Sequence, residues 1–132
     1  LRGAPLVLHI EDDASVADSL ALVLAMEGYA VERAANAEEA LRAVRERALR
    51  PDLVITDFQL PSGATGADVV RQLRAELGTR VPAVLLTGDQ SPARDRHAAG
   101  VVDSVLEKPV DAAELLRRIA QLVASGERGT PA

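Results

Sequence analysis

The fold is decided by a short stretch in the middle of the chain, Leu53-Val54-Ile55-Thr56-Asp57. Its apolar residues 53–55, with Pro51-Asp52 as a turn before them, are typical of a strand that is buried on both faces of a parallel sheet. The strand ends at a carboxylate. Because ligands of open parallel sheets bind outside the carboxyl ends of the strands, this stretch predicts both the kind of sheet and the edge that carries a functional site.

Strand and helix patterns alternate on both sides of this stretch. Strands are predicted at 6–10, 29–34, 53–56, 81–86 and 102–106, and helices follow them at about 15–27, 36–48, 67–77, 91–99 and 111–124. Ser15, Asn36 and Asp111 are the expected N-caps of the first, second and last helices. Residues 1–124 are therefore expected to form one α/β domain, a mostly parallel sheet with helices on both faces, and 125–132 a frayed C-terminal tail.

Composition restricts the possible functions. The chain has 132 residues, a net charge of −5 and no Cys, which argues against direct nucleic-acid binding and excludes disulfides, thiolate zinc sites and a cysteine nucleophile. No apolar run approaches the length of a membrane span, so no membrane contact and a cytoplasmic location are expected. The first residue is Leu1 and the single Met is Met26, which indicates a piece of a longer protein.

Polar residues with related chemistry follow four of the predicted strands. They are Glu11, Asp12 and Asp13 after the first, Asp57 after the third, Thr87 after the fourth and Lys108 after the fifth. Carboxylate oxygens without a soft ligand nearby suit magnesium, which bridges readily to phosphate oxygens. Each residue alone also has an ordinary explanation as a solvated loop, a turn or an exposed charge. Their convergence on one rim favours a site that handles a phosphoryl group.

Asp57 is the best candidate nucleophile of this set. It stands alone at the end of the central strand, whereas the clustered acids are better suited to share a cation. A carboxylate attacks an anionic phosphoryl group only when charge on both is offset, and a divalent ion together with Lys108 would do this. His9 is expected to pack in the core and His97 to be exposed, so neither receives a role.

Four segments, taken in order, resemble the response-regulator receiver family of two-component phosphorelay signalling. They are Ile10-Glu11-Asp12-Asp13, Val54-Ile55-Thr56-Asp57 with Pro61, Leu85-Leu86-Thr87-Gly88, and Leu106-Glu107-Lys108-Pro109. The spacings also agree, with 45 residues from Asp12 to Asp57, 30 from Asp57 to Thr87 and 21 from Thr87 to Lys108. The resemblance covers nearly the whole chain. It implies a flavodoxin-like, doubly wound (βα)5 sandwich with the strand order 2-1-3-4-5.

The resemblance also implies roles for individual residues. Asp57 would be the phosphoacceptor, and Asp12, Asp57 and the main-chain carbonyl of Gln59 would bind Mg2+ or Mn2+, with Glu11 acting through a bound water. Thr87 and Lys108 would hold the phosphoryl group, and the Lys108-Pro109 bond would be cis. The partners implied are a histidine kinase or histidine phosphotransfer domain, and an output domain that is covalently linked or separate. A phosphorylation-dependent homodimer is a further option.

Three positions depart from the family pattern or modulate it. Val105 stands where the family usually has an aromatic residue whose rotamer follows the threonine, so the usual coupling between the two is in question. Gly66 lies nine residues after Asp57 rather than eight, which makes the preceding loop one residue longer and resembles the receivers of hybrid histidine kinases. Gln59 and Asp89 occupy positions at which the family tunes self-dephosphorylation.

Three functions compete. The first is a regulated phosphoacceptor, which catalyses its own phosphorylation without being a free-standing enzyme and switches the face formed by the fourth helix, fifth strand and fifth helix. The second is a degenerate receiver that acts as a constitutive protein-interaction module, motivated by Val105. The third is an aspartyl-phosphate phosphohydrolase, against which Gln59 stands where dehalogenase-type enzymes place a second acid.

Overall fold

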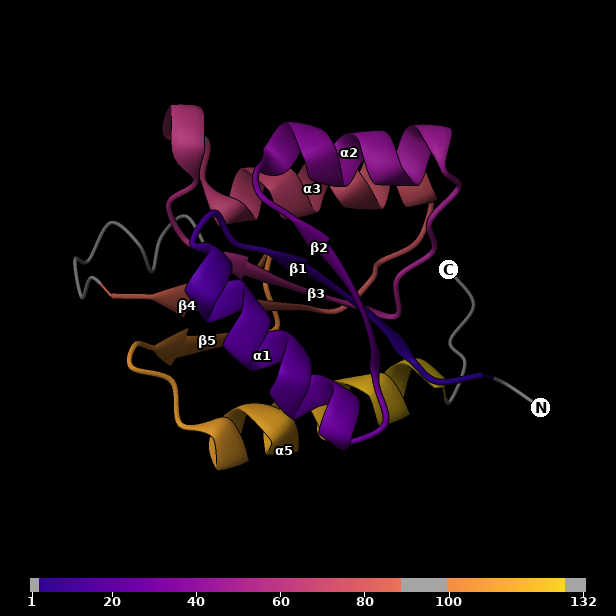
Figure 1. Ribbon diagram of the computed structural model, residues 1–132. Coiled ribbons are helices and arrows are strands. Elements are labelled where there is room, and N and C mark those ends of the chain that lie inside the picture. Colours follow the sequence, from indigo (N-terminus) through magenta and orange to yellow (C-terminus); the bar gives the residue numbers. More distant parts are fainter. Residues whose placement is uncertain (1–2, 89–99, 128–132) are drawn as a thin grey trace.

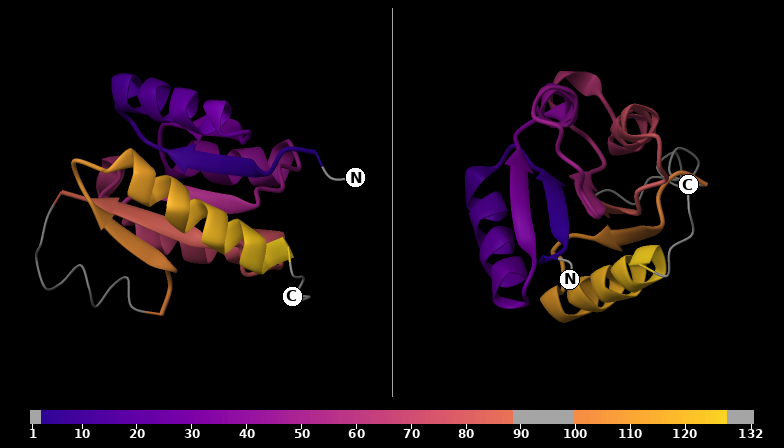
Figure 2. Two further views of the ribbon diagram at one scale, coloured as in Figure 1. Left: turned by 90° about the horizontal axis from the view of Figure 1, so that it is seen from below. Right: turned by 90° about the vertical axis from the view of Figure 1, so that its right-hand side faces the viewer.

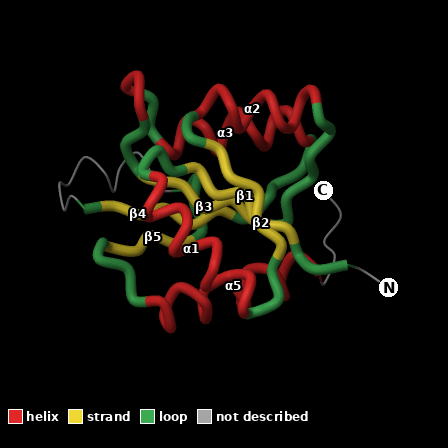
Figure 3. The backbone as a smooth tube through the Cα atoms, viewed as in Figure 1, coloured by secondary structure: helices red, strands yellow, loops and turns green. Residues whose placement is uncertain are grey.

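A five-stranded parallel sheet forms the centre of the molecule. The structure, a computed structural model, describes residues 3–88 and 100–127. The strands are β1 (Leu6–Ile10), β2 (Ala30–Ala34), β3 (Leu53–Asp57), β4 (Ala83–Thr87) and β5 (Ser104–Glu107). They are all parallel and lie in the order β2-β1-β3-β4-β5, which confirms the predicted doubly wound topology (Figure 3).

Helices cover both faces of the sheet. Those described are α1 (Ala14–Met26), α2 (Ala37–Glu46), α3 (Gly66–Leu77) and α5 (Ala112–Glu127), with a 3-10 turn at Pro61–Gly63. The pair α2 and α3 lies on one face and the pair α1 and α5 on the other (Figures 1 and 2). None of these described helices is long and apolar enough to cross a membrane. The helix predicted at 91–99 lies outside the described residues.

The ends of several elements differ from the sequence-based expectation. Strand β4 starts at Ala83 rather than at residue 81, since Pro82 has no N–H to donate to a neighbouring strand. Strand β5 starts at Ser104, two residues later than predicted. Helix α5 continues to Glu127 and so includes residues 125–127 of the segment predicted as a tail.

Polar side chains cap the N-termini of the helices. Asn36 accepts a hydrogen bond from the backbone N–H of Glu39 at 2.8 Å, and Asp111 caps the start of α5, as predicted. The prediction of Ser15 as the cap of α1 is wrong. The helix begins one residue before Ser15, and Asp13 is the cap, with its carboxylate accepting from the N–H of Val16 at 3.2 Å. The carboxylate of Asp13 is therefore engaged in capping α1.

Two aliphatic cores fill the space between the sheet and its helices. Alternate residues of each strand face opposite layers, so Leu8 and Val54 belong to the core beneath α2 and α3, whereas Val7 and Ile55 belong to the core beneath α1 and α5. All four are fully buried. Every residue of β3 and β4 is buried, as expected for central strands of a parallel sheet, and this rigid centre positions the residues that follow the strands.

Candidate functional site

The register of the sheet brings four strand ends to one edge. Ile10 of β1 pairs with Thr56 of β3, so the residues that follow, Glu11 and Asp57, are neighbours across that edge. On the other side the N–H of Lys108 donates to the carbonyl of Thr87 at 2.8 Å. The predicted convergence of acids, hydroxyl and ammonium on one rim is thus found, because parallel strands all end at the same edge.

Three acids form a compact cluster at this edge. One carboxylate oxygen from each of Glu11, Asp12 and Asp57 lies within 4.8 Å of the others. Glu11 is 6% exposed and Asp57 7%, whereas Asp12 is exposed. Asp13 does not belong to the cluster, although its N–H donates to Oε2 of Glu11 at 3.1 Å. Two acids therefore stand in a desolvated position and one stands at its mouth.

Lys108 offsets part of this negative charge. Its Nζ lies 3.0 Å from Oδ1 of Asp57 and 3.8 Å from Oε1 of Glu11. Burial alone would lower the pKa of Lys108, but its pairing with Asp57 outweighs burial and raises that pKa. The ammonium is consequently charged throughout the physiological range and points at the oxygen predicted to act as nucleophile.

Glu11 has a strongly raised carboxyl pKa in this cluster. Burial and the neighbouring Asp57 raise the pKa of Glu11 to about 7, even though the N–H of Asp13 works in the opposite direction. Its Oε1 is buried and accepts no hydrogen bond from the described residues. A buried carboxylate oxygen without a donor, next to two further carboxylates, suits a hard divalent cation such as magnesium. The residues present therefore fit the metal that the sequence implies.

The remaining predicted residues surround this cluster or lie beyond the described part of the chain. Thr87 ends β4 and is 2% exposed. Gln59 is exposed and forms an isolated antiparallel bridge with Thr65, which folds the loop back beside Asp57. Val105 is half-buried on β5. Asp89 and His97 lie outside the described residues, and the Lys108-Pro109 bond is cis as the family resemblance implies.

Gly66 has a structural role at the site that the sequence did not predict. The sequence showed only that Gly66 follows Asp57 by nine residues. A Cβ atom placed on Gly66 would lie 2.3 Å from the carbonyl oxygen of Asp57 and 2.7 Å from Cδ1 of Leu85. Its N–H also donates to the carbonyl of Phe58 at 2.7 Å. Only a glycine lets α3 start this close to the strand end, so Gly66 fixes the backbone on which Asp57 stands.

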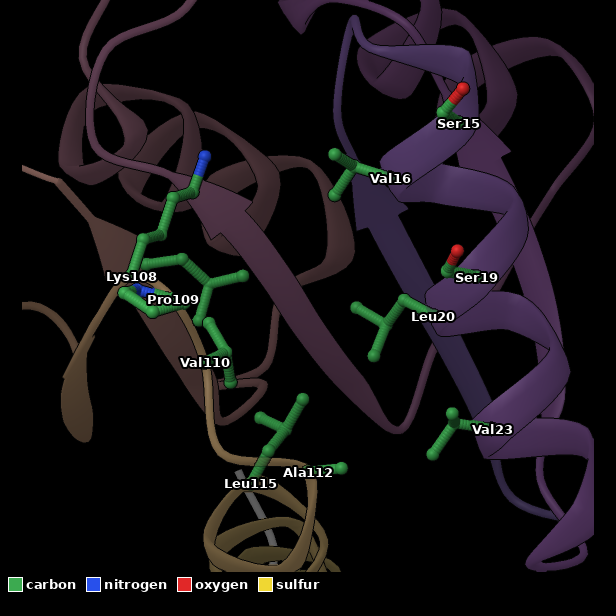
Figure 4. Close-up of a pocket in the computed structure, with 11 residues that line it drawn as sticks. Ser15, Val16, Ser19, Leu20, Val23, Lys108, Pro109, Val110, Ala112 and Leu115 are labelled. Atoms are coloured by element: carbon green, nitrogen blue, oxygen red, sulfur yellow. The ribbon is translucent and has the colours of Figure 1, made fainter.

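An apolar groove of about 420 Å³ adjoins the site and was also not predicted. It runs between α1 and the start of α5, and Figure 4 shows Val16 and Leu20 facing Pro109, Val110 and Leu115 across it. Lys108 lines the groove and also reaches the acid cluster. The groove and the acid cluster therefore share one residue.

An acid cluster and a lysine at the carboxyl edge of a flavodoxin-like sheet define the class of signalling receiver domains. The model of the family described as "Response regulator receiver domain" matches residues 7–120, and the chain belongs to this family. It is 42% identical over 115 residues to the DNA-binding response regulator MtrA of Mycolicibacterium smegmatis, a match that covers 86% of this chain and 48% of that protein. The chain spans about one third to one half of the length of the curated relatives it matches.

Solved structures agree with this assignment. A CheY-like receiver domain protein from Methanospirillum hungatei matches with a TM-score of 0.86 and 25% identity, covering 96% of this chain and 98% of that one. The receiver domain of a histidine kinase from Syntrophus aciditrophicus matches with a TM-score of 0.84 and 27% identity, covering 98% and 97%. The chain is thus a receiver domain of the response-regulator family of two-component signalling, in a fold shared with both.

Proposed function

We propose that this domain accepts a phosphoryl group on Asp57 from a phosphohistidine of a histidine kinase or a histidine phosphotransfer domain. The observation that carries the proposal is the position of Asp57, between Lys108 at 3.0 Å and the acids Glu11 and Asp12. The P–N bond of the donor breaks as a P–O bond to an Asp57 oxygen forms. Lys108 offsets the charge of the phosphoryl group as it arrives, and Thr87 donates a hydrogen bond to it.

Glu11, Asp12 and Asp57, together with the main-chain carbonyl of Gln59, would hold Mg2+ or Mn2+. When bound, the ion supplies charge neutralisation between the carboxylates and the phosphoryl oxygens. Oε1 of Glu11, which is buried and accepts no hydrogen bond from the described residues, supports this assignment. Glu11 and Asp12 otherwise repel each other and Asp57, and within residues 3–88 and 100–127 the cation paired with this cluster is Lys108.

The test is a mass measurement. The intact domain is incubated with acetyl phosphate, with Mg2+ or with excess EDTA, and its mass gain is followed by mass spectrometry. One phosphoryl group is expected with Mg2+, none with EDTA and none in Asp57→Ala. Asp68→Asn, which changes an exposed carboxylate on α3, serves as the matched control and should behave as wild type. An equal gain in Asp57→Ala would contradict the proposal.

The donor protein docks, in this proposal, over the apolar groove between α1 and α5. The groove starts at Lys108 and leads away from the site, so a helix lying in it would bring a histidine to Asp57. The α1 residues that line the groove are all uncharged, namely Ser15, Val16, Ser19, Leu20 and Val23. The one acidic residue of α1, Asp18, does not line the groove and is paired with Arg33 at 2.6 Å. An apolar helical surface next to the phosphohistidine is the partner that this chemistry fits.

The output of the domain passes through the face that includes β5 and α5, toward an output domain that is covalently linked or separate. Relatives named as DNA-binding response regulators are longer than this chain, which supports an output domain outside it and leaves this domain without direct nucleic-acid contact. A phosphorylation-dependent homodimer in the cytoplasm is a further part of this proposal.

A constitutive interaction module is the second candidate, and the aliphatic Val105 at the half-buried position of β5 favours it. The two candidates differ in the response to beryllofluoride, which mimics the bound phosphoryl group. Amide exchange of residues 102–107 should change in a regulated receiver on addition of Mg2+ and beryllofluoride. Bound beryllofluoride without any change there would favour the constitutive module.

A further inference from the structure

Phe58, the single phenylalanine of the chain, follows Asp57 directly. The residue is 8% exposed and does not belong to either of the two main cores. It forms a small separate cluster with Leu85 of β4, against which Val102 and Val105 pack. The side chain next to the acceptor thus contacts the strand that leads to Lys108.

The backbone of Phe58 is held on both sides. Its N–H donates to the carbonyl of Leu86 at 2.8 Å, and its carbonyl accepts from the N–H of Gly66 at 2.7 Å. Gly66 lies so close to this backbone that a Cβ on it would be 2.3 Å from the carbonyl oxygen of Asp57 and 2.7 Å from Cδ1 of Leu85. Because protein interiors are close-packed, a displacement of the Asp57 backbone is passed to the cluster rather than absorbed.

Val105 completes the path to β5. It pairs with Leu85 in the β4–β5 register, so Phe58 and Val105 pack around the same leucine. Val105 is small and β-branched, with few rotamers of its own to change. The ring of Phe58 is the one aromatic group among the members of this cluster, and its side chain has two torsion angles where that of Val105 has one.

We propose that Phe58 transmits the phosphorylation state of Asp57 to β5. Its ring would repack against Val102 and Val105 when Asp57 carries a phosphoryl group. This inference rests on the proposed function of Asp57 as phosphoacceptor and adds the residue through which the occupied site is sensed. The cluster has two packings, and the phosphoryl group favours the second. The signal therefore starts from the residue that follows the acceptor and needs no aromatic side chain on β5.

The test uses the fact that the chain has one Phe and one Tyr. Biosynthetic labelling with 4-fluorophenylalanine gives one fluorine resonance at Phe58, and 3-fluorotyrosine gives one at Tyr29. Tyr29 packs against the core beneath α1 and α5, in the other layer, and is the matched control. Both labelled domains are titrated with Mg2+ and beryllofluoride, and the resonances of the bound beryllofluoride report occupancy of Asp57 in the same spectra.

A shift or a new line of the Phe58 resonance, in proportion to bound beryllofluoride, is expected, with the Tyr29 resonance nearly unchanged. Bound beryllofluoride with an unmoved Phe58 resonance would overturn the inference and leave the proposed function intact. Absence of bound beryllofluoride, together with no mass gain from acetyl phosphate, would overturn the proposed function itself. The two failures are therefore distinguishable.

A substitution provides the second readout. Phe58→Leu keeps an apolar side chain but removes the ring, so phosphoryl uptake from acetyl phosphate should stay within about threefold of wild type. The change in amide exchange of residues 102–107 on adding beryllofluoride should fall to less than half. A full exchange response in Phe58→Leu would contradict the inference. The fluorine experiment needs no substitution and decides the question if this variant fails to fold.

Discussion

Lys108 Nζ lies 3.0 Å from Oδ1 of Asp57, and this ion pair joins the end of β5 to the end of the central strand β3. The pair is formed at the edge of the sheet where two further acids lie within 4.8 Å. It gives the proposed acceptor oxygen a cation in the absence of any phosphoryl group. We therefore expect the ammonium of Lys108 to act by offsetting negative charge at Asp57. Its removal should affect phosphoryl transfer more than folding.

Replacing Lys108 with Met should slow phosphoryl uptake from acetyl phosphate about 100-fold, because a positioned positive group at the developing charge is lost. The Met side chain keeps the apolar stem, and so the variant should remain folded by circular dichroism. The rate is measured by intact mass over time with saturating Mg2+. A rate within threefold of wild type would show that the ion pair has no part in the transfer.

Magnesium affinity should depend on pH through Glu11. The pKa of Glu11 is raised to about 7, and a carboxylate binds a cation only when deprotonated, so affinity should be lost as the pH falls through 7. At pH 6 the apparent affinity should be about tenfold weaker than at pH 8. Calorimetric titration with MgCl2 at both pH values measures it.

Glu11→Gln provides the control for this pH dependence. Its affinity should be weaker than that of wild type at pH 8 and should change little between pH 8 and pH 6. If Glu11→Gln retained the full pH dependence, another group would be responsible.

His9 should make the fold less stable in acid. It is fully buried with both ring nitrogens lacking a hydrogen-bond partner among the described residues, and burial, Arg33 and Lys108 lower its pKa to about 4. The unfolded chain binds a proton near pH 6.5, whereas the folded chain resists it until about pH 4. Stability is therefore complete above pH 6.5 and is lost as the pH falls toward 4.

His9→Val removes this liability. On going from pH 8 to pH 5, wild type should lose about 2 kcal/mol more of its free energy of unfolding than the variant does. Urea unfolding at the two pH values gives the difference. A wild-type-minus-variant difference that stays constant with pH would refute the assignment to His9.

Gly66→Ala should destabilise the domain by about 3 kcal/mol, since its Cβ would lie 2.3 Å from the carbonyl oxygen of Asp57 and backbone must shift to admit it. Gly3→Ala is the matched control, because a Cβ there meets nothing within 4 Å. Thermal and urea unfolding measure both. Equal free energies of unfolding of the two variants would show that the backbone at Asp57 can shift to admit the Cβ without loss of stability.

Val16→Asn should separate the two kinds of phosphodonor. Val16 is 40% exposed on the wall of the groove, and loss of its apolar surface should slow transfer from a phosphohistidine protein about fivefold. Acetyl phosphate needs no docking, so its rate should not change. Leu22→Asn, on the same helix but outside the groove and 63% exposed, is the control. Equal effects of the two substitutions on transfer would contradict docking at the groove.

Much of the fold and site was predictable because the relevant signals are local. Apolar runs indicated buried strands, and the residues after them were Glu11, Asp57, Thr87 and Lys108. Parallel strands end at one edge, so these residues had to converge. The cap of α1 was not predictable in this way, since Asp13 and Ser15 are both good caps and the choice depends on where the helix starts.

Other features depended on contacts between distant segments. The cluster of Phe58 with Val102 and Val105 joins residues far apart in sequence, and their side chains alone suggested only that Phe58 fills a gap. The groove is made by α1 and the start of α5, neither of which forms it alone. The close approach of Gly66 to Asp57 likewise appears only once α3 is packed beneath the strand.

The sequence by itself determined the order of strands and helices and the set of residues at the functional edge, because these follow from hydrophobic periodicity and from the residues that end each strand. The tertiary structure alone decided the electrostatics of that edge. Glu11 is buried and Asp12 exposed although they are neighbours in sequence, and the difference comes from packing against other strands. Desolvation and ion-pair distance set the charge state of such groups, and both are properties of the folded chain.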